Sequence, residues 1–264
     1  MALPPGLAPV TDLTPCAWVA DALAEGGDTV AGGVLPGGYE AYVRLPHPVD
    51  EGPEGDGGDA DGTWAAAAVR NSTVAHPLAQ WERIALDRGE HDPPEGELDA
   101  RTLAALVPVL AAHTATPEDC LFGVWDGYFG GRTAYLTDRT GLRARLWVAR
   151  RRREERERNR RFAALPALAT PGRDYLFLRG PVTEAERASR LATGGGLFRR
   201  GPNLWWPADR AWCVASEIDF SSTYVGGSAR LARALLGHER LEAWPASPGD
   251  LTTLDADTVN PPRP

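Results

Sequence analysis

The chain of 264 residues contains no lysine, so all 28 of its basic residues are arginine. This excludes the phosphate-binding loop GxxxxGK[ST], because that motif requires a lysine. Only three cysteines occur, Cys16, Cys120 and Cys213, and none forms a CxxC pair. Neither a disulfide scaffold nor a structural zinc site is therefore indicated. Cys120 and Cys213 lie within apolar runs and are expected to be buried, reduced thiols.

Long apolar runs are also missing. No stretch approaches the roughly 18 consecutive apolar residues that a membrane helix needs. The first residues, MALPPGLAPV, lack the positive and apolar regions of a signal peptide. A cytoplasmic protein without membrane contact is the expectation. The net charge of −8 disfavours non-specific attraction to nucleic acid, and the absence of GxSxG disfavours an α/β-hydrolase.

The periodic segments predict an α+β fold, a mixed and mostly antiparallel sheet with helices packed on it. Helices are expected at 14–24, 64–70, 77–86, 98–112, 183–191 and 229–236. Strands are expected at 39–45, 120–125, 144–149, 173–178 and 212–220. Helices outnumber strands and do not alternate strictly with them, which favours α+β over a doubly wound sheet.

One domain is predicted at 13–254, between a flexible N-terminus at 1–12 and a flexible tail at 255–264. Within it, the acidic, Gly-rich segment 50–62 has no apolar residue except one alanine. Such a composition cannot offset the entropy of ordering, so a mobile loop is expected.

An arginine-rich insertion is predicted at 143–170. Its centre, Arg150–Arg161, holds eight arginines and three glutamates. These residues predict a solvated helical extension with Glu–Arg pairs. Nucleic-acid binding is the alternative. It is disfavoured because aromatic residues are not interleaved and the chain is acidic overall.

Two acidic residues lie near the end of the expected strand Trp212–Phe220. Because side chains alternate along a strand, Glu217 and Asp219 are predicted to project side by side. Such a pair can bind a divalent cation, act as general acid and base, or accept hydrogen bonds from amides and arginines. The structural role is favoured, and a metal site would add Asp126 or Asp209.

Trp205 and Trp206 precede Pro207 in an expected loop, so at least one of the two indoles is predicted to be partly exposed. An exposed indole is typical of a recognition surface. The candidate binding surface comprises Trp205, Trp206, Asp209, Arg210, Glu217, Asp219 and Tyr224. Its acidic character suits a basic partner.

Two other patterns carry less weight. A nucleophile pair of Cys120 or Cys213 with His76 or His113 has no local support, since cysteines within apolar strands are usually inert. The turn at 226–228 precedes a helix and could receive an anion on its amides. A plain connection is favoured there.

Four blocks carry a resemblance: AHPLAQW (75–81), HTATPEDCLFGVWDG (113–127), PGRDYLFLRGPV (171–182) and NLWWPADRAWCVASEIDFSSTYVGGS (203–228). Together they resemble a group of uncharacterised actinobacterial proteins, over most of the chain from Gly37 to Asp250. The resemblance implies no activity and no catalytic residues. The acidic segment and the arginine-rich segment depart from the pattern of that group.

The sequence favours a non-enzymatic protein that binds another protein or a small ligand, in an immunity or regulatory role. The partner is unknown, a basic one suits the acidic surface, and no cofactor is expected. The alternative is a metal-dependent hydrolase or nuclease with Glu217 and Asp219 as ligands.

Overall fold

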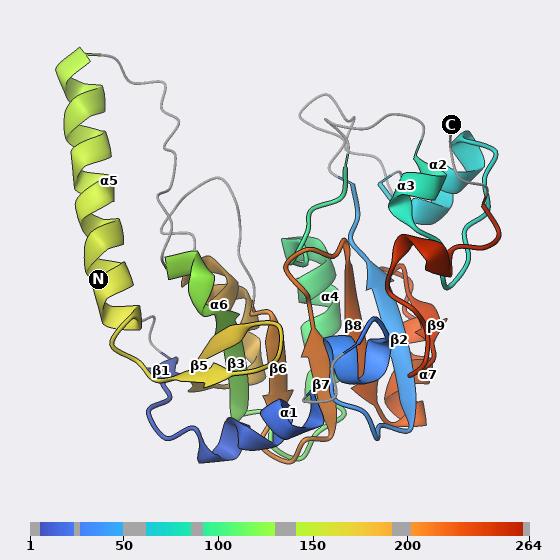
Figure 1. Ribbon diagram of the computed structural model, residues 1–264, viewed down its shortest axis with the longest axis horizontal. Coiled ribbons are helices and arrows are strands. Elements are labelled where there is room, and N and C mark those ends of the chain that lie inside the picture. The colour runs from blue at the N-terminus through green and yellow to red at the C-terminus, as the bar shows by residue number, and fades with distance from the viewer. Residues whose placement is uncertain are drawn as a thin grey trace.

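The computed structural model describes residues 6–23, 27–49, 62–85, 92–129, 141–191 and 202–260. Its centre is a nine-stranded sheet (Figure 1). The strands are β1 (Ala8–Pro9), β2 (Ala41–Pro46), β3 (Cys120–Trp125), β4 (Ala167–Ala169), β5 (Asp174–Gly180), β6 (Leu204–Pro207), β7 (Trp212–Ala215), β8 (Ser222–Gly227) and β9 (Trp244–Ala246). Their order is β1-β5-β3-β6-β7-β8-β2-β9, with β4 also paired to β5. All these pairings are antiparallel, which confirms the α+β class.

Helices cover both faces of the sheet. They are α1 (Ala17–Ala22), α2 (Trp64–Arg70), α3 (Trp81–Ile84), α4 (Ala100–Ala111), α5 (Gly141–Phe162), α6 (Ala185–Leu191) and α7 (Ala229–Leu236). One face packs against α4, α6 and α7, and the other packs against α1 and the segment 30–35. A third, smaller cluster joins α2 and α3 beside β9.

Because both faces are covered, the central strands bury consecutive side chains on opposite sides. In β6, Trp205 joins the cluster under α4 while Trp206 joins the cluster under α1. In β7, Trp212 and Cys213 divide in the same way. Trp205–Trp206 therefore belongs to a central strand, and the expected loop at this position is wrong.

Local signals fixed several elements correctly. The strand Cys120–Trp125 and the helix Trp64–Arg70 have the predicted bounds. The helix Ala229–Leu236 begins after Ser228, whose hydroxyl accepts a hydrogen bond from the Leu231 amide, and it ends at Gly237. A capping residue followed by apolar residues at helical spacing was thus sufficient to predict the bounds of this helix.

The segment 144–149 was expected to be a strand and is instead part of α5. The predicted strand Trp212–Phe220 ends at Ala215, and the turn 216–221 joins it to β8. The expected helix at 77–86 is only the single turn Trp81–Ile84. A short apolar run fits either period, and a hairpin partner sets where a strand stops.

The helices expected at 14–24 and 183–191 each begin with a 3-10 turn, and neither Thr14 nor Thr183 caps it with its side chain. Thr14 instead donates to Asp12, and the Glu184 carboxylate pairs with Arg187.

Both chain ends contribute to the fold more than expected. Ala8–Pro9 pairs with β5, and Leu7 and Val10 are buried. In the tail, Asp257 and Asn260 are buried and hydrogen-bonded to each other. Residues 7–10 and 255–260, which were expected to be flexible, therefore pack against the fold in part. Residues 1–5, 261–264 and 50–61 lie outside the described residues.

Within the described ranges, no helix combines the length and apolar character that crossing a bilayer would demand.

Candidate functional site

The predicted carboxylates lie at one end of the sheet. Here β2, β3 and β7 end while β5, β6 and β8 begin, as the pairs Pro46–Ser222, Trp125–Tyr175 and Leu204–Ala215 show. The turn 216–221 between β7 and β8 carries Glu217 and Asp219. A second segment, 92–99, lies against this turn, and its Gly96 amide donates to the Phe220 carbonyl at 2.9 Å.

Arg173 contacts both predicted carboxylates. Its Nε lies 2.9 Å from Glu217 Oε1, and its Nη2 donates to Asp219 Oδ2 at 2.5 Å. The Asp219 amide donates to Glu217 Oε2 at 2.6 Å. The guanidinium also lies over the indole of Trp125, 5.6 Å from its centroid. The two acids therefore come together, and the cation that they bind is an arginine of the same chain.

This pairing leaves few carboxylate oxygens available to bind a metal ion. Glu217 Oε2 and Asp219 Oδ2 each accept a hydrogen bond from the chain, and Glu217 Oε1 is ion-paired with Arg173, as expected for the structural role. Asp126 begins the 3-10 turn Asp126–Phe129 after β3. Across the described part of the chain, no three His, Cys, Asp or Glu side chains are arranged to hold a metal ion.

The other members of the predicted surface lie elsewhere. Asp209 is in the β6–β7 loop, at the opposite end of β7 from Glu217. Its carboxylate accepts from Thr114 Oγ1 and from the Ala115 amide, both at 2.7 Å. Burial raises the pKa of Asp209, but these hydrogen bonds outweigh it and leave the pKa below its usual value. Asp209 thus holds the β6–β7 loop against Thr114 and Ala115.

Arg210 adopts a left-handed backbone conformation, with φ of 54°. Its guanidinium lies over the indole of Trp18, 4.7 Å from the centroid. This side chain covers α1 at the far end of the sheet, so it is not part of one surface with Glu217 and Asp219.

The predicted exposure of Trp205 or Trp206 is wrong. Their exposed fractions are 1% and 0%, and that of Tyr224 is 4%. Trp205 stacks on Phe122 and Trp206 meets Trp18 edge to face. In this conformation none of the three aromatic residues can contact a partner at the surface.

A buried chain of hydrogen bonds lies beneath the carboxylates. His47 Nδ1 is 2.6 Å from the Pro94 carbonyl oxygen, which can only accept, so this nitrogen carries the proton. Nε2 then accepts from Thr223 Oγ1 at 2.8 Å, and Thr223 accepts from Ser216 Oγ at 2.6 Å. Burial holds His47 neutral by lowering its pKa to about 4.

Asn203 extends this network. Its Oδ1 accepts from the Trp125 amide at 3.0 Å, and its Nδ2 donates to the carbonyls of Gly96 and Ser216. The buried network therefore fixes the segment 92–99 and the turn 216–221 as one rigid unit. Sequence reasoning missed both His47 and Asn203, and their only signal was a polar residue beside an apolar run.

Acidic side chains crowd around this unit. We call Glu82, Asp92, Glu95, Glu217 and Asp219 the acidic rim. Burial, and then repulsion from Asp219 and the other members, raises the pKa of Glu95. Arg173 is the only cation paired with Glu217 and Asp219 in the described residues. The half-buried Ile218 and Phe220 lie in the same turn.

The other reactive side chains are occupied or shielded. His76 pairs with the buried Asp257 at 2.9 Å, and His113 Nδ1 donates to the Val109 carbonyl. Burial raises the pKa of the Cys120 thiol to about 12 and also raises that of Cys213. The Cys–His pairs, which the sequence did not favour, are therefore not formed.

The turn at 226–228 also has no evident room for an anion, because the adjacent amide and the space beside the turn are already taken up by the chain. The first amide of α7, that of Ala229, donates to the carboxylate of Glu40 at 2.9 Å. Gly226 lies against Tyr39 and Leu35, with no room for a side chain. This confirms the plain connection favoured for the turn.

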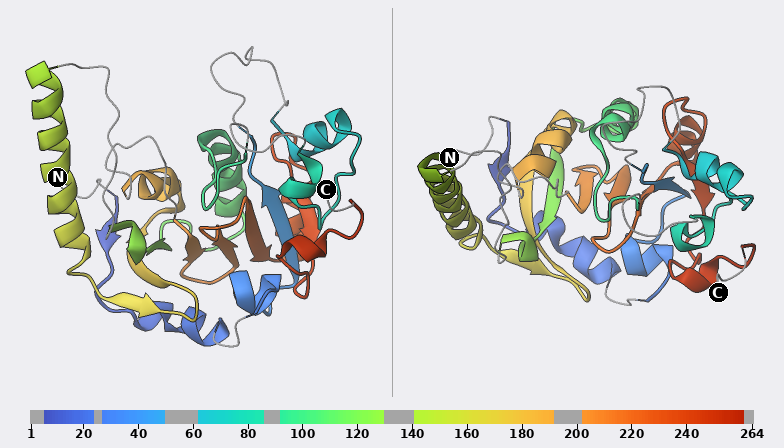
Figure 2. Two further views of the ribbon diagram at one scale, coloured as in Figure 1. Left: turned by 45° about the horizontal axis from the view of Figure 1, so that its top comes forward. Right: turned by 90° about the horizontal axis from the view of Figure 1, so that it is seen from above.

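The arginine-rich insertion forms a helix that projects from the body. Among the described elements, Figures 1 and 2 show α5 standing apart from the others, beyond the β1–β5 end of the sheet. Its C-terminal end is anchored, because Phe162 is buried and stacks on Phe129 with centroids 4.3 Å apart. The predicted helical extension is confirmed, and it begins earlier, at Gly141.

Six positions spaced by four and three residues lie along one exposed side of α5. We call Leu142, Leu146, Ala149, Arg153, Arg156 and Arg160 the α5 stripe. The exposed fractions of Leu142 and Leu146 are 70% and 62%. Two of the three glutamates of the helix pair with other arginines, Glu154 with Arg150 and Glu157 with Arg161. No ion pair to a stripe arginine occurs among the described residues.

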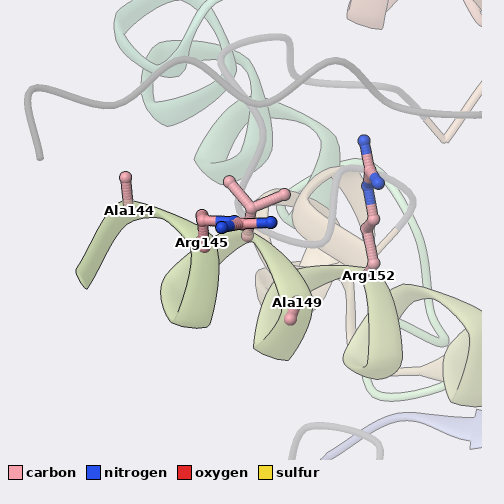
Figure 3. A pocket seen from close by; sticks show the side chains of 5 residues that line it. Ala144, Arg145, Ala149 and Arg152 are labelled. Carbon is pink, nitrogen blue, oxygen red and sulfur yellow. The ribbon is translucent and has the colours of Figure 1, made fainter. Parts of the chain in front are cut away.

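A shallow hollow lies along α5. Figure 3 shows its lining, which is Ala144, Arg145, Val148, Ala149 and Arg152. The side chains that line it within the described residues all come from this one helix.

No family model, curated protein or solved structure matched this chain. The resemblance to actinobacterial proteins therefore stays a prediction, and function is argued from the geometry alone.

Proposed function

We propose that this chain is a non-catalytic protein-binding module that contacts its partner through the α5 stripe. The observation that supports this proposal is a helix of 22 residues, about 33 Å long. It exposes two leucines and three arginines that form no ion pair with the part of the chain that the structure describes. The proposal keeps the binding role and the cytoplasmic location expected from the sequence, and moves the binding surface from the tryptophans to α5.

The stripe has no evident role in stability. Largely exposed leucines contribute little to folding, because apolar side chains stabilise a fold only when they leave water. An isolated helix is only marginally stable in water. The contacts that hold α5 to the body lie near its C-terminal end, where Glu155 and Phe162 are buried. A long, exposed apolar and cationic face is instead typical of a recognition element.

Catalysis is less well supported. The carboxylates of the alternative metal site face Arg173, and the His47 network is sealed from solvent. Burial raises the pKa of Cys16 and Cys120 to about 12, so neither thiol ionises readily near neutral pH.

The chemistry of the stripe indicates the class of partner. Leu142, Leu146 and Ala149 form an apolar half, while Arg153, Arg156 and Arg160 form a cationic half. The spacing is that of a coiled-coil seam. A protein surface offers apolar and acidic groups together, whereas a nucleic-acid duplex offers mainly phosphates to such a helix.

The test is fluorescence anisotropy with a labelled helical peptide that carries leucines in one half of its seam and glutamates in the other. The arm variant, R153E/R156E/R160E, should lose binding by at least tenfold. The control variant, R101E/R230E/R240E, has the same charge change at exposed sites elsewhere and should bind like the parent chain.

Equal binding by the arm variant and the parent chain would refute the proposal. A short DNA duplex that binds α5 more tightly than the peptide, with a steep salt dependence, would replace protein by nucleic acid as the partner.

A further inference from the structure

The charges of this chain are divided between α5 and the body. The helix holds ten arginines and three glutamates, a charge of +7. The whole chain carries −8, so the remainder carries −15. A cationic arm on a strongly acidic body is electrostatically complementary to the body of another copy.

We infer that the partner of α5 is a second copy of this chain, whose acidic rim receives the α5 stripe. This inference rests on the proposed function and names its partner. The rim suits the stripe in two respects. Glu82, Asp92 and Glu95 are exposed acids that can face arginines, and Ile218 and Phe220 are half-buried apolar side chains that can face leucines.

The rim is also pre-organised. The buried network of His47, Thr223 and Asn203 holds the segment 92–99 against the turn 216–221. Burial, and after it repulsion from the other carboxylates of the rim, raises the pKa of Glu95, so the like charges stay together at a cost in stability. A cationic partner relieves that repulsion, and a rigid surface loses little entropy when it binds.

Pairing between two α5 helices is disfavoured. Whether two α5 helices pack parallel or antiparallel, the arginines of one stripe would face the other stripe, which contains no acidic residue. Parallel stripes would oppose three arginines on each side, and like charges in contact repel. The acids therefore have to come from the body.

Contact between an arm and a rim is heterologous, because each surface meets a different one on the partner. Such contacts link copies head to tail and produce rings or open chains. One helix face forms a small interface, below about 1,200 Å² in total. The association should therefore be weak, dependent on concentration and sensitive to salt.

Sedimentation velocity on the full chain tests the inference. The weight-average mass should rise with concentration in low salt and return to the monomer value in high salt. The arm variant should stay monomeric. The rim variant, E82R/E95R/D219N, should also stay monomeric, although it retains the arm.

An equimolar mixture of the arm variant and the rim variant gives the sharpest result. The intact rim of the first and the intact arm of the second should form a one-to-one dimer. That dimer cannot grow, because its other arm and other rim are altered. The controls are R101E/R230E/R240E and E118R/E239R/D255N, which change the charge equally and should self-associate like the parent chain. Circular dichroism verifies that each variant is folded.

Three outcomes would overturn the inference: a parent chain that stays monomeric in low salt, an arm variant that associates like the parent chain, or a mixture that stays monomeric. If the acidic peptide still binds the parent chain through α5, the proposed function stands and only the identity of the partner is wrong. If the peptide also fails to bind, both are wrong.

Discussion

Lowering the pH should destabilise this protein through one buried histidine. His47 is neutral in the folded chain, with a pKa of about 4, whereas a histidine in an unfolded chain has a pKa near 6.5. Between these two values the unfolded chain binds a proton that the folded chain does not. The free energy of unfolding therefore falls as the pH falls from 6.5 towards 4, and the contribution of neutral His47 is complete above pH 6.5.

The size of the effect follows from the two pKa values. A separation of about 2.5 pKa units corresponds to about 3 kcal/mol, at about 1.4 kcal/mol per unit. This is a large part of the stability of an ordinary domain. The principal cause is burial, and the nearby charge of Arg44 acts in the same direction, while Pro94 and Asp99 oppose it.

Urea unfolding of the parent chain and of His47→Asn, from pH 7 to pH 4.5, measures this contribution. Carboxylates also titrate in this range, and subtracting the two curves removes their part. At pH 7 the variant should be less stable by about 1–3 kcal/mol, because Thr223 and Pro94 lose their partner. That difference should shrink as the pH falls. Parallel curves would refute the neutral state assigned to His47.

Three further results are expected. Trp206→Ala should lower the free energy of unfolding by about 3–5 kcal/mol in urea titrations, whereas an exposed indole would cost little. Arg173→Ala should destabilise by about 1 kcal/mol, and Mg²⁺ or Mn²⁺ should leave the melting temperature of the parent chain unchanged; a metal-induced increase would restore the alternative site. A thiol reagent should label Cys16, Cys120 and Cys213 only in denaturant, and rapid labelling of the folded chain would contradict their burial.

The parts of the fold that sequence predicts well have complete local signals. Ser228 supplies a cap, Gly237 supplies a stop, and the residues between them have a helical period. The strand Cys120–Trp125 is a continuous apolar run bounded by polar residues. No distant contact was needed to place either element.

The errors occur where distant segments decide the outcome. The strand from Trp212 stops at Ala215 because its hairpin partner β8 requires a turn there. Trp206 is buried because α1, almost two hundred residues earlier in the chain, covers that face of the sheet. The carboxylates of Glu217 and Asp219 were correctly expected together, but their partner Arg173 lies just before β5 and could not be chosen from spacing alone.

Hydrogen–deuterium exchange as a function of protein concentration tests the central claim most directly. In a dilute monomer the amides of α5 near Leu142–Ala149 should exchange rapidly, since few contacts protect them. As the concentration rises in low salt, protection should appear in α5 and, on the partner copy, in the turn 216–221. Unchanged exchange in α5 at every concentration, with or without the acidic peptide, would contradict its role as the recognition surface.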